Sequence, residues 1–269
     1  MKKIFLLIAA SASFLSCSTN KITGTKQLLL VSEGEMQAMS LTEYQKVIST
    51  SKVLSPTNNK NAAMVQRVSN RLINAITTYY NQNNLGQELA GYKWEVNLID
   101  ENTVNAWCMP GGKIVVYTGI LPVTQNETAL AIVMGHEITH ALAKHGAARM
   151  SQGLLQQFGG AALAVAIQNK PAETQNLYNT AFGIGTNVGF ILPFSRSNET
   201  EADKFGLRYA ALAGYDPREA VAFWQRMSQL SGGQKPPAFL STHPADEKRI
   251  ADLQNIMDET LKNYYKPVK

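Results

Sequence analysis

Two histidines and a glutamate stand together in the segment His136-Glu137-Ile138-Thr139-His140. On a helix, positions four apart lie about 40° from each other, so His136 and His140 would point the same way and could hold one metal ion. Glu137 lies about 100° from His136, where its carboxylate would stand beside the metal and could take a proton from water. Two helix-surface histidines with ordinary partners are the alternative, but the apolar run before the motif favours zinc.

The small number of histidines limits which other residues could be metal ligands. A hydrolytic zinc site has three protein ligands and one position for water, and the sequence contains 4 His. His145 follows His140 by five residues, about 140° round a helix, so we expect it to face away from the metal as a solvent or helix-end residue. The third ligand is therefore expected to be a carboxylate from elsewhere in the chain.

The acidic segment 198–203 offers that carboxylate. Glu199 and Asp203 share one helix face, whereas Glu201 lies about 160° from Glu199. With Glu199 as ligand, Asp203 could accept the outer N–H of a metal-bound histidine and so fix the orientation of its ring. Glu201 is the rival ligand without this pairing, and a solvated acidic helix start is the remaining alternative. We predict the ligands of one zinc ion to be His136, His140 and Glu199.

His243 lies in the segment Ser241-Thr242-His243-Pro244, directly before a predicted helix. It could be an ordinary turn residue. It could instead donate a hydrogen bond to the oxyanion of a tetrahedral intermediate, as a catalytic residue beside Glu137. As a third possibility, it could occupy the open zinc position in a latent resting state. Both functional alternatives place His243 in the catalytic cleft.

The N-terminus is typical of an exported protein. Lys2 and Lys3 precede a short apolar stretch, so residues 1–16 are predicted to be a signal peptide rather than a buried helix. Phe14-Leu15-Ser16-Cys17 resembles a bacterial lipobox, in which the cysteine is lipidated; an ordinary cysteine near a cleavage site is the alternative. By the same resemblance, serine after the cysteine indicates the outer membrane. We then expect a tether over 17–30 and one domain over 31–269.

Composition excludes several classes of protein. Of the 269 residues, 45% are hydrophobic and 17% are charged, which excludes a disordered chain, and 2 Cys exclude a disulfide scaffold. No apolar run reaches about 18 residues, so we expect no spanning helix. The formal net charge is +5, but two of the lysines belong to the predicted leader, and nucleic acid is therefore not an expected partner.

Periodicity predicts mostly helices around a small set of strands, and hence an α+β fold. The predicted helices cover 33–51, 61–79, 124–143 and 198–214, one begins at 217, and the last covers 244–265. Strands are expected over 92–98, 104–109 and 113–118, the last two joined by a turn at Pro110-Gly111-Gly112. The helix of the histidine motif should begin with a capping box from Thr124 to Glu127. The Gly- and Ala-rich segment 151–194 would form buried helices or a mobile cover.

These motifs together resemble the gluzincin metallopeptidases, and within them the family of HtpX and the type I CAAX prenyl proteases. Soluble, membrane-associated bacterial members, such as the periplasmic beta-barrel assembly-enhancing protease, are the most similar group. The resemblance extends from about residue 30 to residue 255. It implies a mostly helical zincin-type domain with a small mixed sheet, an active-site helix and one zinc ion per chain.

The same resemblance implies a substrate-binding strand. Residues 105–112 are similar to the family's Asn-Ala-Phe-x-x-Pro-Gly-Gly strand, which lies at the sheet edge above the metal and can pair with a peptide backbone. Asn105 and Ala106 are the positions expected to contact substrate. Cys108 departs from the family pattern, and we expect it to fill a small apolar space.

Two arginines, Arg196 and Arg249, also match the family pattern. The resemblance implies that they are ion-pair partners in or near the cleft.

The resemblance implies a zinc-dependent metalloendopeptidase that hydrolyses unfolded or misassembled envelope proteins in quality control. A lipid at Cys17 would hold it at the membrane, on the periplasmic face of the outer membrane. The alternative is a chaperone-like or latent scaffold lipoprotein that binds unfolded envelope proteins with little cleavage. A purely structural zinc is a third possibility, which the position of Glu137 disfavours.

Overall fold

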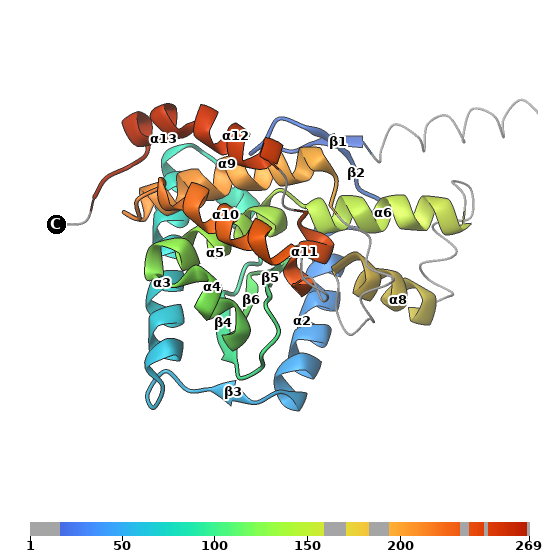
Figure 1. Ribbon diagram of the computed structural model, residues 1–269. Coiled ribbons are helices and arrows are strands. Elements are labelled where there is room, and N and C mark those ends of the chain that lie inside the picture. Colours follow the sequence, from blue (N-terminus) through green and yellow to red (C-terminus); the bar gives the residue numbers. More distant parts are fainter. Residues whose placement is uncertain (1–16, 159–170, 183–193, 232–236, 245–246, 268–269) are drawn as a thin grey trace, which may run out of the picture.

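The computed structural model describes residues 17–158, 171–182, 194–231, 237–244 and 247–267 (Figure 1). The signal peptide predicted over 1–16 lies outside the described residues, as does much of the segment 151–194. Within the described chain, no helix has an apolar stretch long enough to cross a bilayer.

A four-stranded mixed sheet supports the site. Its strands are β3 (Val53–Leu54), β4 (Glu95–Ile99), β5 (Ala106–Met109) and β6 (Lys113–Tyr117), in the spatial order β3-β4-β6-β5. β4 and β6 run parallel, while β3 and β5 are antiparallel to their neighbours. β5 therefore forms one edge of this sheet, as the family resemblance implied.

The turn between β5 and β6 confirms the predicted hairpin. Gly111 and Gly112 have φ angles of 79° and 81°, a left-handed conformation that glycine adopts without steric cost. A Cβ atom on Gly112 would also lie 2.7 Å from a ring carbon of Trp94. The Gly-Gly pair thus allows both the turn and the close approach of the indole ring.

Helices account for most of the remaining described chain. They are α2 (Glu33–Thr50), α3 (Lys60–Gln82), α4 (Leu121–Thr124), α5 (Glu127–Leu142), α6 (His145–Phe158), α8 (Pro171–Phe182), α9 (Arg196–Leu212), α10 (Glu219–Ser231), α11 (Ala238–Thr242), α12 (Glu247–Asn255) and α13 (Met257–Asn263), with short 3-10 turns η1 (Gly86–Leu89) and η2 (Thr118–Ile120). The α+β fold with a small mixed sheet is confirmed.

The two faces of the sheet are covered by different helices, and Figure 1 shows the strands between α2 and α3. Because side chains alternate along a strand, Leu98 and Val116 join the main core with α3 and α5, whereas Ile99 and Val115 pack with Tyr44 of α2. The catalytic helix candidate α5 therefore lies in the main core, and its residues from Ala129 to Leu142 are all buried.

Two predicted helix boundaries were wrong. Thr124 ends α4, and Gln125 has a left-handed φ of 65°, so the cap of α5 is Asn126, whose side chain accepts a hydrogen bond from Ala129 N. The capping box predicted from Thr124 therefore does not form. The last predicted helix is divided into α12 and α13, with Ile256 between them.

Helices α5 and α9 cross at two glycines. A Cβ atom on Gly206 would lie 2.6 Å from the backbone nitrogen of His136, and one on Gly135 would lie 2.7 Å from the carbonyl oxygen of Gly206. Side chains at either position would push the helices apart. The crossing therefore brings the acidic segment of α9 against the histidine motif of α5.

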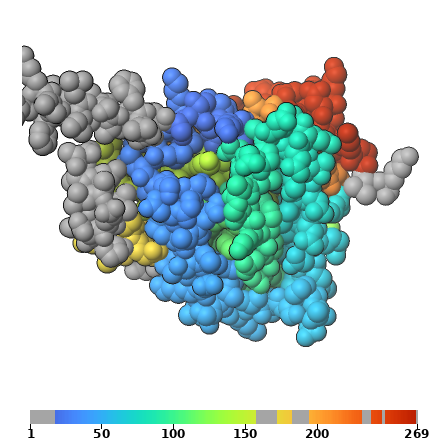
Figure 2. Space-filling view, turned by 180° about the vertical axis from the view of Figure 1, so that it is seen from behind, coloured from blue at the N-terminus to red at the C-terminus, as the bar shows by residue number. Residues whose placement is uncertain are grey.

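Residues 17–30, predicted to be a tether, contain an antiparallel pair of strands, β1 (Cys17–Thr19) and β2 (Lys26–Leu28). The hairpin lies beside α6 in Figure 1, and Figure 2 shows its residues, in dark blue, on the outside of the molecule. Gln27 donates through Nε2 to the carbonyl of Ala143 at 2.7 Å, and Leu30 N donates to Oγ of Ser151 at 2.9 Å. The segment is thus hydrogen-bonded to the end of the histidine helix and to the helix that follows.

Candidate metal centre

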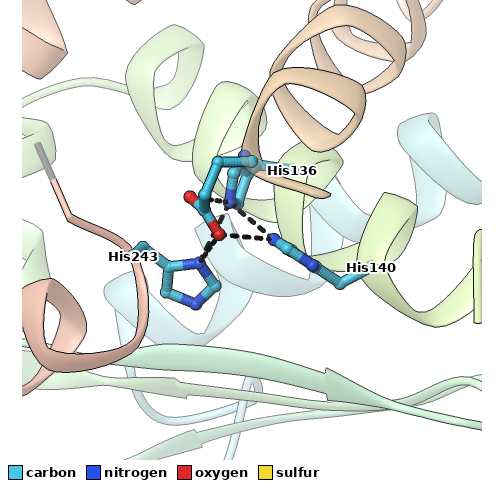
Figure 3. A group of neighbouring side chains, drawn as sticks. His136, His140 and His243 are labelled. Atoms are coloured by element: carbon cyan, nitrogen blue, oxygen red, sulfur yellow. Dashed lines mark hydrogen bonds and ion pairs between the residues drawn. The ribbon is translucent and has the colours of Figure 1, made fainter. Parts of the chain in front are cut away.

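Three histidines and one carboxylate converge in the core. His136 and His140 come from α5, Glu199 from the first turn of α9, and His243 from the end of α11; one potential ligand atom from each lies within 4.8 Å of all the others. Figure 3 shows the three imidazole rings turned toward a common carboxylate. All four side chains are buried. The structure thus brings together the three ligands predicted from the sequence and adds His243 to them.

The distances between these donor atoms fit a single small cation. Nε2 of His136 lies 3.0 Å from Nε2 of His140, 3.2 Å from Nδ1 of His243 and 3.6 Å from Oε2 of Glu199. Oε1 of Glu199 lies 3.4 Å from Nε2 of His140 and 3.0 Å from Nδ1 of His243. Tetrahedral zinc with ligand bonds of about 2.0–2.1 Å has ligands about 3.3 Å apart. The nitrogen and oxygen donor set is also one that zinc prefers.

Asp203 and Arg249 fix the ring of His136. Nδ1 of His136 lies 3.0 Å from Oδ1 of Asp203, and Arg249 donates through Nε to the other oxygen of Asp203 at 2.6 Å. Nη2 of Arg249 also lies 3.1 Å from Nδ1 of His136, but a guanidinium has no acceptor and cannot take a proton from that nitrogen. The Nδ1 proton of His136 therefore goes to Asp203, and the bare Nε2 faces the other donors. This is the pairing expected from the shared helix face of Glu199 and Asp203.

Charge and burial set the protonation of the four donors. Burial lowers the pKa of His136 and His140 well below the ordinary value, so both rings are neutral with a lone pair to offer. Burial would raise the pKa of Glu199, but His243 and Arg249 outweigh it and hold that pKa well below its usual range. Nη1 of Arg249 lies 2.6 Å from Oε2 of Glu199. The centre thus combines neutral nitrogens with an ionised carboxylate.

Glu137 is a buried carboxylate with an unusual environment. Its Oε1 accepts no hydrogen bond from the described part of the chain, and Nε2 of His243 lies 3.4 Å from it. Burial and the neighbouring Glu199 raise its pKa well above the ordinary value. A carboxylate of this kind, beside four metal-binding donors, is suited to accept a proton.

His145 is outside the group of four donors, as predicted, but it is buried and hydrogen-bonded rather than exposed to solvent. Helix α5 ends at Leu142, Lys144 has a left-handed φ of 58°, and α6 begins at His145, so the angular count along one helix does not apply. Nδ1 of His145 lies 2.9 Å from Nδ1 of His140, and Nε2 lies 3.1 Å from Oε2 of Glu201. Glu201, the rival ligand candidate, therefore bonds to His145 outside the donor cluster. Gly146 follows this helix break, but the residue with the left-handed φ is Lys144, whose type does not usually end a helix.

The end of the segment 151–194 covers the donors. The ring of Phe194 stacks on His140 with centroids 4.0 Å apart, and the guanidinium of Arg149 lies 3.7 Å from the centroid of Phe194. Phe194 N also donates to the carbonyl of Thr242, next to His243. Phe194 could not be recognised from the sequence, because its contact with His140 depends on how distant segments pack.

The predicted substrate strand is the edge strand β5. Ala106 is its first residue, and the side-chain oxygen of Asn105 accepts from Ala106 N at 3.0 Å. Cys108 belongs to the buried main core, and burial raises its pKa well above the ordinary value. This environment agrees with an apolar space-filling role for the thiol.

The profile of peptidase family M48 matches residues 59–257, from the start of α3 into α13, and so includes all four donors. The chain belongs to peptidase family M48. The family resemblance drawn from the motifs is thus confirmed, and the domain is that of a zinc metallopeptidase with a site for one zinc ion.

Curated relatives of this M48 chain include mitochondrial proteins and a bacterial protein. It is 39% identical over 178 residues to "Mitochondrial metalloendopeptidase OMA1" of Arabidopsis thaliana, covering 65% of this chain and 34% of the relative. It is 30% identical over 270 residues to "Metalloendopeptidase OMA1, mitochondrial" of Homo sapiens (93% and 47%), and 32% identical over 185 residues to "Beta-barrel assembly-enhancing protease" of Escherichia coli (64% and 37%). The chain spans about half or less of the length of these relatives.

Proposed function

We propose that this protein is a zinc-dependent metalloendopeptidase that uses Glu137 as its general base. The observation that carries the proposal is the position of Glu137, a buried carboxylate without a hydrogen-bond donor at Oε1 among the described residues, next to the four convergent donors. A structural zinc site would have no use for such a group. The match to peptidase family M48 supports the same function.

The residues of the site divide the work of hydrolysis. His136, His140 and Glu199 would hold the zinc ion, which supplies a Lewis acid that polarises the scissile carbonyl and makes water more acidic. Glu137 takes the proton from the attacking water and delivers it to the leaving nitrogen. Its raised pKa makes the protonated form accessible between these two steps.

The position of His243 supports a latent resting state of the peptidase. Its Nδ1 points at the donors of Glu199 and His136, at 3.0 and 3.2 Å. Four protein donors leave no position for water, as in structural zinc sites. His243 would therefore have to leave the donor set before cleavage. The alternative role, a hydrogen-bond donor to the oxyanion, would use the same residue after that movement.

Replacing His243 with Ala separates these two roles. If His243 blocks the open position, H243A should cleave unfolded protein faster than the wild type while retaining zinc. A drop in cleavage with zinc retained would contradict latency and favour the oxyanion role.

We further propose that the substrates are unfolded or misassembled envelope proteins and that the protein acts in quality control, held at the periplasmic face of the outer membrane by a lipid on Cys17. The name of the Escherichia coli relative, "Beta-barrel assembly-enhancing protease", refers to the assembly of envelope beta-barrels, which supports this proposal. The edge strand β5 offers backbone groups that could pair with any extended segment. The closed donor set with His243 favours the second candidate, a binding protein with little cleavage.

One comparison tests the peptidase proposal. Wild type, E137Q and E127Q are purified, their zinc content is measured, and each is incubated with unfolded casein. E127Q is the matched control, because Glu127 lies in the first turn of the same helix and pairs with Arg67 at the surface. We expect E137Q to keep zinc and lose cleavage while E127Q keeps both. Cleavage by E137Q at the wild-type rate would refute the role of Glu137.

A further inference from the structure

A chain of polar contacts leads from His140 to the N-terminal hairpin. Nδ1 of His140 lies 2.9 Å from Nδ1 of His145, and Nε2 of His145 lies 3.1 Å from Oε2 of Glu201. The other oxygen of Glu201 accepts a hydrogen bond from the hydroxyl of Thr25, between β1 and β2. His145 is 1% exposed, so water does not substitute for these partners. This series of polar contacts lies on the opposite side of the His140 ring from the donor cluster.

The direction of these hydrogen bonds follows from the carboxylate of Glu201, which accepts from His145. Nε2 of His145 faces a carboxylate oxygen, which accepts, so a His145 ring that holds one proton carries it on Nε2 and donates it to Glu201. Nδ1 of His145 is then bare, and it can only accept the N–H at Nδ1 of His140. A neutral His140 with its proton on Nδ1 has a bare Nε2, which is the nitrogen that faces Glu199 and His136. Glu201 thereby selects the metal-binding tautomer of His140 through an intervening ring.

This arrangement repeats, on the second histidine, what Asp203 does for the first. Asp203 accepts directly from Nδ1 of His136, whereas Glu201 acts on His140 through His145. Both carboxylates and the ligand Glu199 come from one stretch of α9. Because Glu201 points to the opposite side of that helix, it needs the additional ring of His145 to reach the metal centre.

We infer that His145 and Glu201 are positioning residues for the zinc ligand His140, and that Thr25 makes the N-terminal hairpin a part of the metal centre. The inference rests on the proposed zinc peptidase function. Gln27 supports the role of the hairpin, since it bonds to the carbonyl of Ala143 in the turn that precedes His145. The hairpin thus makes hydrogen bonds both to the carboxylate of Glu201 and to the turn that precedes His145. Residues outside the matched family region 59–257 would then contribute to zinc binding.

The test is a zinc affinity measurement on the full chain, by competition with a chromophoric chelator, for the variants H145F, H145N, E201A, T25V and T25S. Phe removes the acceptor opposite His140, whereas the side-chain oxygen of Asn can take the place of Nδ1. We expect H145F to bind zinc about 10- to 100-fold more weakly, as for other residues that orient metal ligands. H145N should stay close to wild type, E201A should weaken binding, and T25S should bind more tightly than T25V.

Two further measurements separate positioning from a role in folding. The absorption spectrum of the cobalt-substituted protein reports ligand geometry, and thermal unfolding of the metal-free protein reports stability. Y209F is the matched control, because it removes a buried hydrogen bond between Tyr80 and Tyr209 on the same helix α9 without touching the metal centre. Y209F should lower the metal-free unfolding temperature and leave zinc affinity and the cobalt spectrum unchanged.

The inference is overturned if H145F binds zinc as tightly as wild type with an unchanged cobalt spectrum, or if H145N is as weak as H145F. Should H145F fail to fold, E201A and T25V decide the matter, and wild-type zinc affinity in both contradicts it. These measurements need no cleavage. An inactive protein that shows the expected affinities would refute the proposed peptidase function and leave this inference intact.

Discussion

The crossing of α5 and α9 allows a quantitative prediction for the variant G206A. Its Cβ atom would meet three backbone atoms, His136 N at 2.6 Å, Gly135 C at 2.8 Å and His136 Cα at 2.8 Å. Ordinary contacts of this kind are at least about 3.4 Å, so the helices must separate by roughly 0.6–0.8 Å. Overpacking of a core by one methyl group costs about 1–3 kcal/mol. The better helix propensity of Ala returns at most about 1 kcal/mol.

The separation should also reach the metal centre. Glu199 and Asp203 lie within two turns of Gly206 on the same helix, so a shift of α9 carries their carboxylates away from the histidine rings. Donor distances of 3.0–3.6 Å would lengthen by a comparable amount. We therefore expect G206A to lose both stability, by about 1–2 kcal/mol, and zinc affinity.

Urea unfolding of the metal-free protein and zinc competition measure the two effects. G34A is the control, because Gly34 is also helical but a Cβ atom there would meet nothing within 4 Å. G34A should be as stable as wild type or slightly more so. If G206A behaves like G34A in both measurements, the close approach of the two helices does not position the site.

Three other predictions follow from buried charge, metal linkage and capping. R249M should lower the unfolding free energy by about 3–5 kcal/mol in urea, because Glu199 and Asp203 lose their buried partner, and a loss below 1 kcal/mol would contradict this. Removing zinc with a chelator should lower the unfolding temperature and adding zinc should restore it, since a free concentration of 1,000 times Kd stabilises by about 4 kcal/mol; an unchanged temperature would argue against binding in the folded state. N126A should destabilise by about 1 kcal/mol in urea through the lost cap of α5, whereas a neutral effect would show that the bond to Ala129 N is unimportant.

The parts of the site that could be predicted from sequence depend on spacing within one helix. His136 and His140 share a face of α5, and Glu199 and Asp203 share a face of α9, so simple angular counting placed each pair. The β5–β6 hairpin was predicted in the same local way from Gly111 and its neighbour. These relations need no knowledge of the rest of the fold.

Other relations depend on a break in the chain or on packing between distant segments. Counting from His140 did not predict the buried contact between His145 and His140, because the chain breaks at the left-handed residue Lys144 between two helices. The approach of Phe194 and Thr25 to the centre depends on the packing of the segment before α9 and of the N-terminal hairpin. No local pattern in the sequence carries that information.

The contacts made by the stretch of α9 from Glu199 to Asp203 depend on the number of residues in this part of the chain. Three acidic residues within five positions bind, directly or through His145, to groups on both sides of the helix. Deleting or inserting one residue next to them would rotate the whole set by about 100° relative to α5. Each contact could be lost singly by substitution, but a change of length would remove all three together. In evolutionary terms, this helix can vary in residue type far more readily than in register.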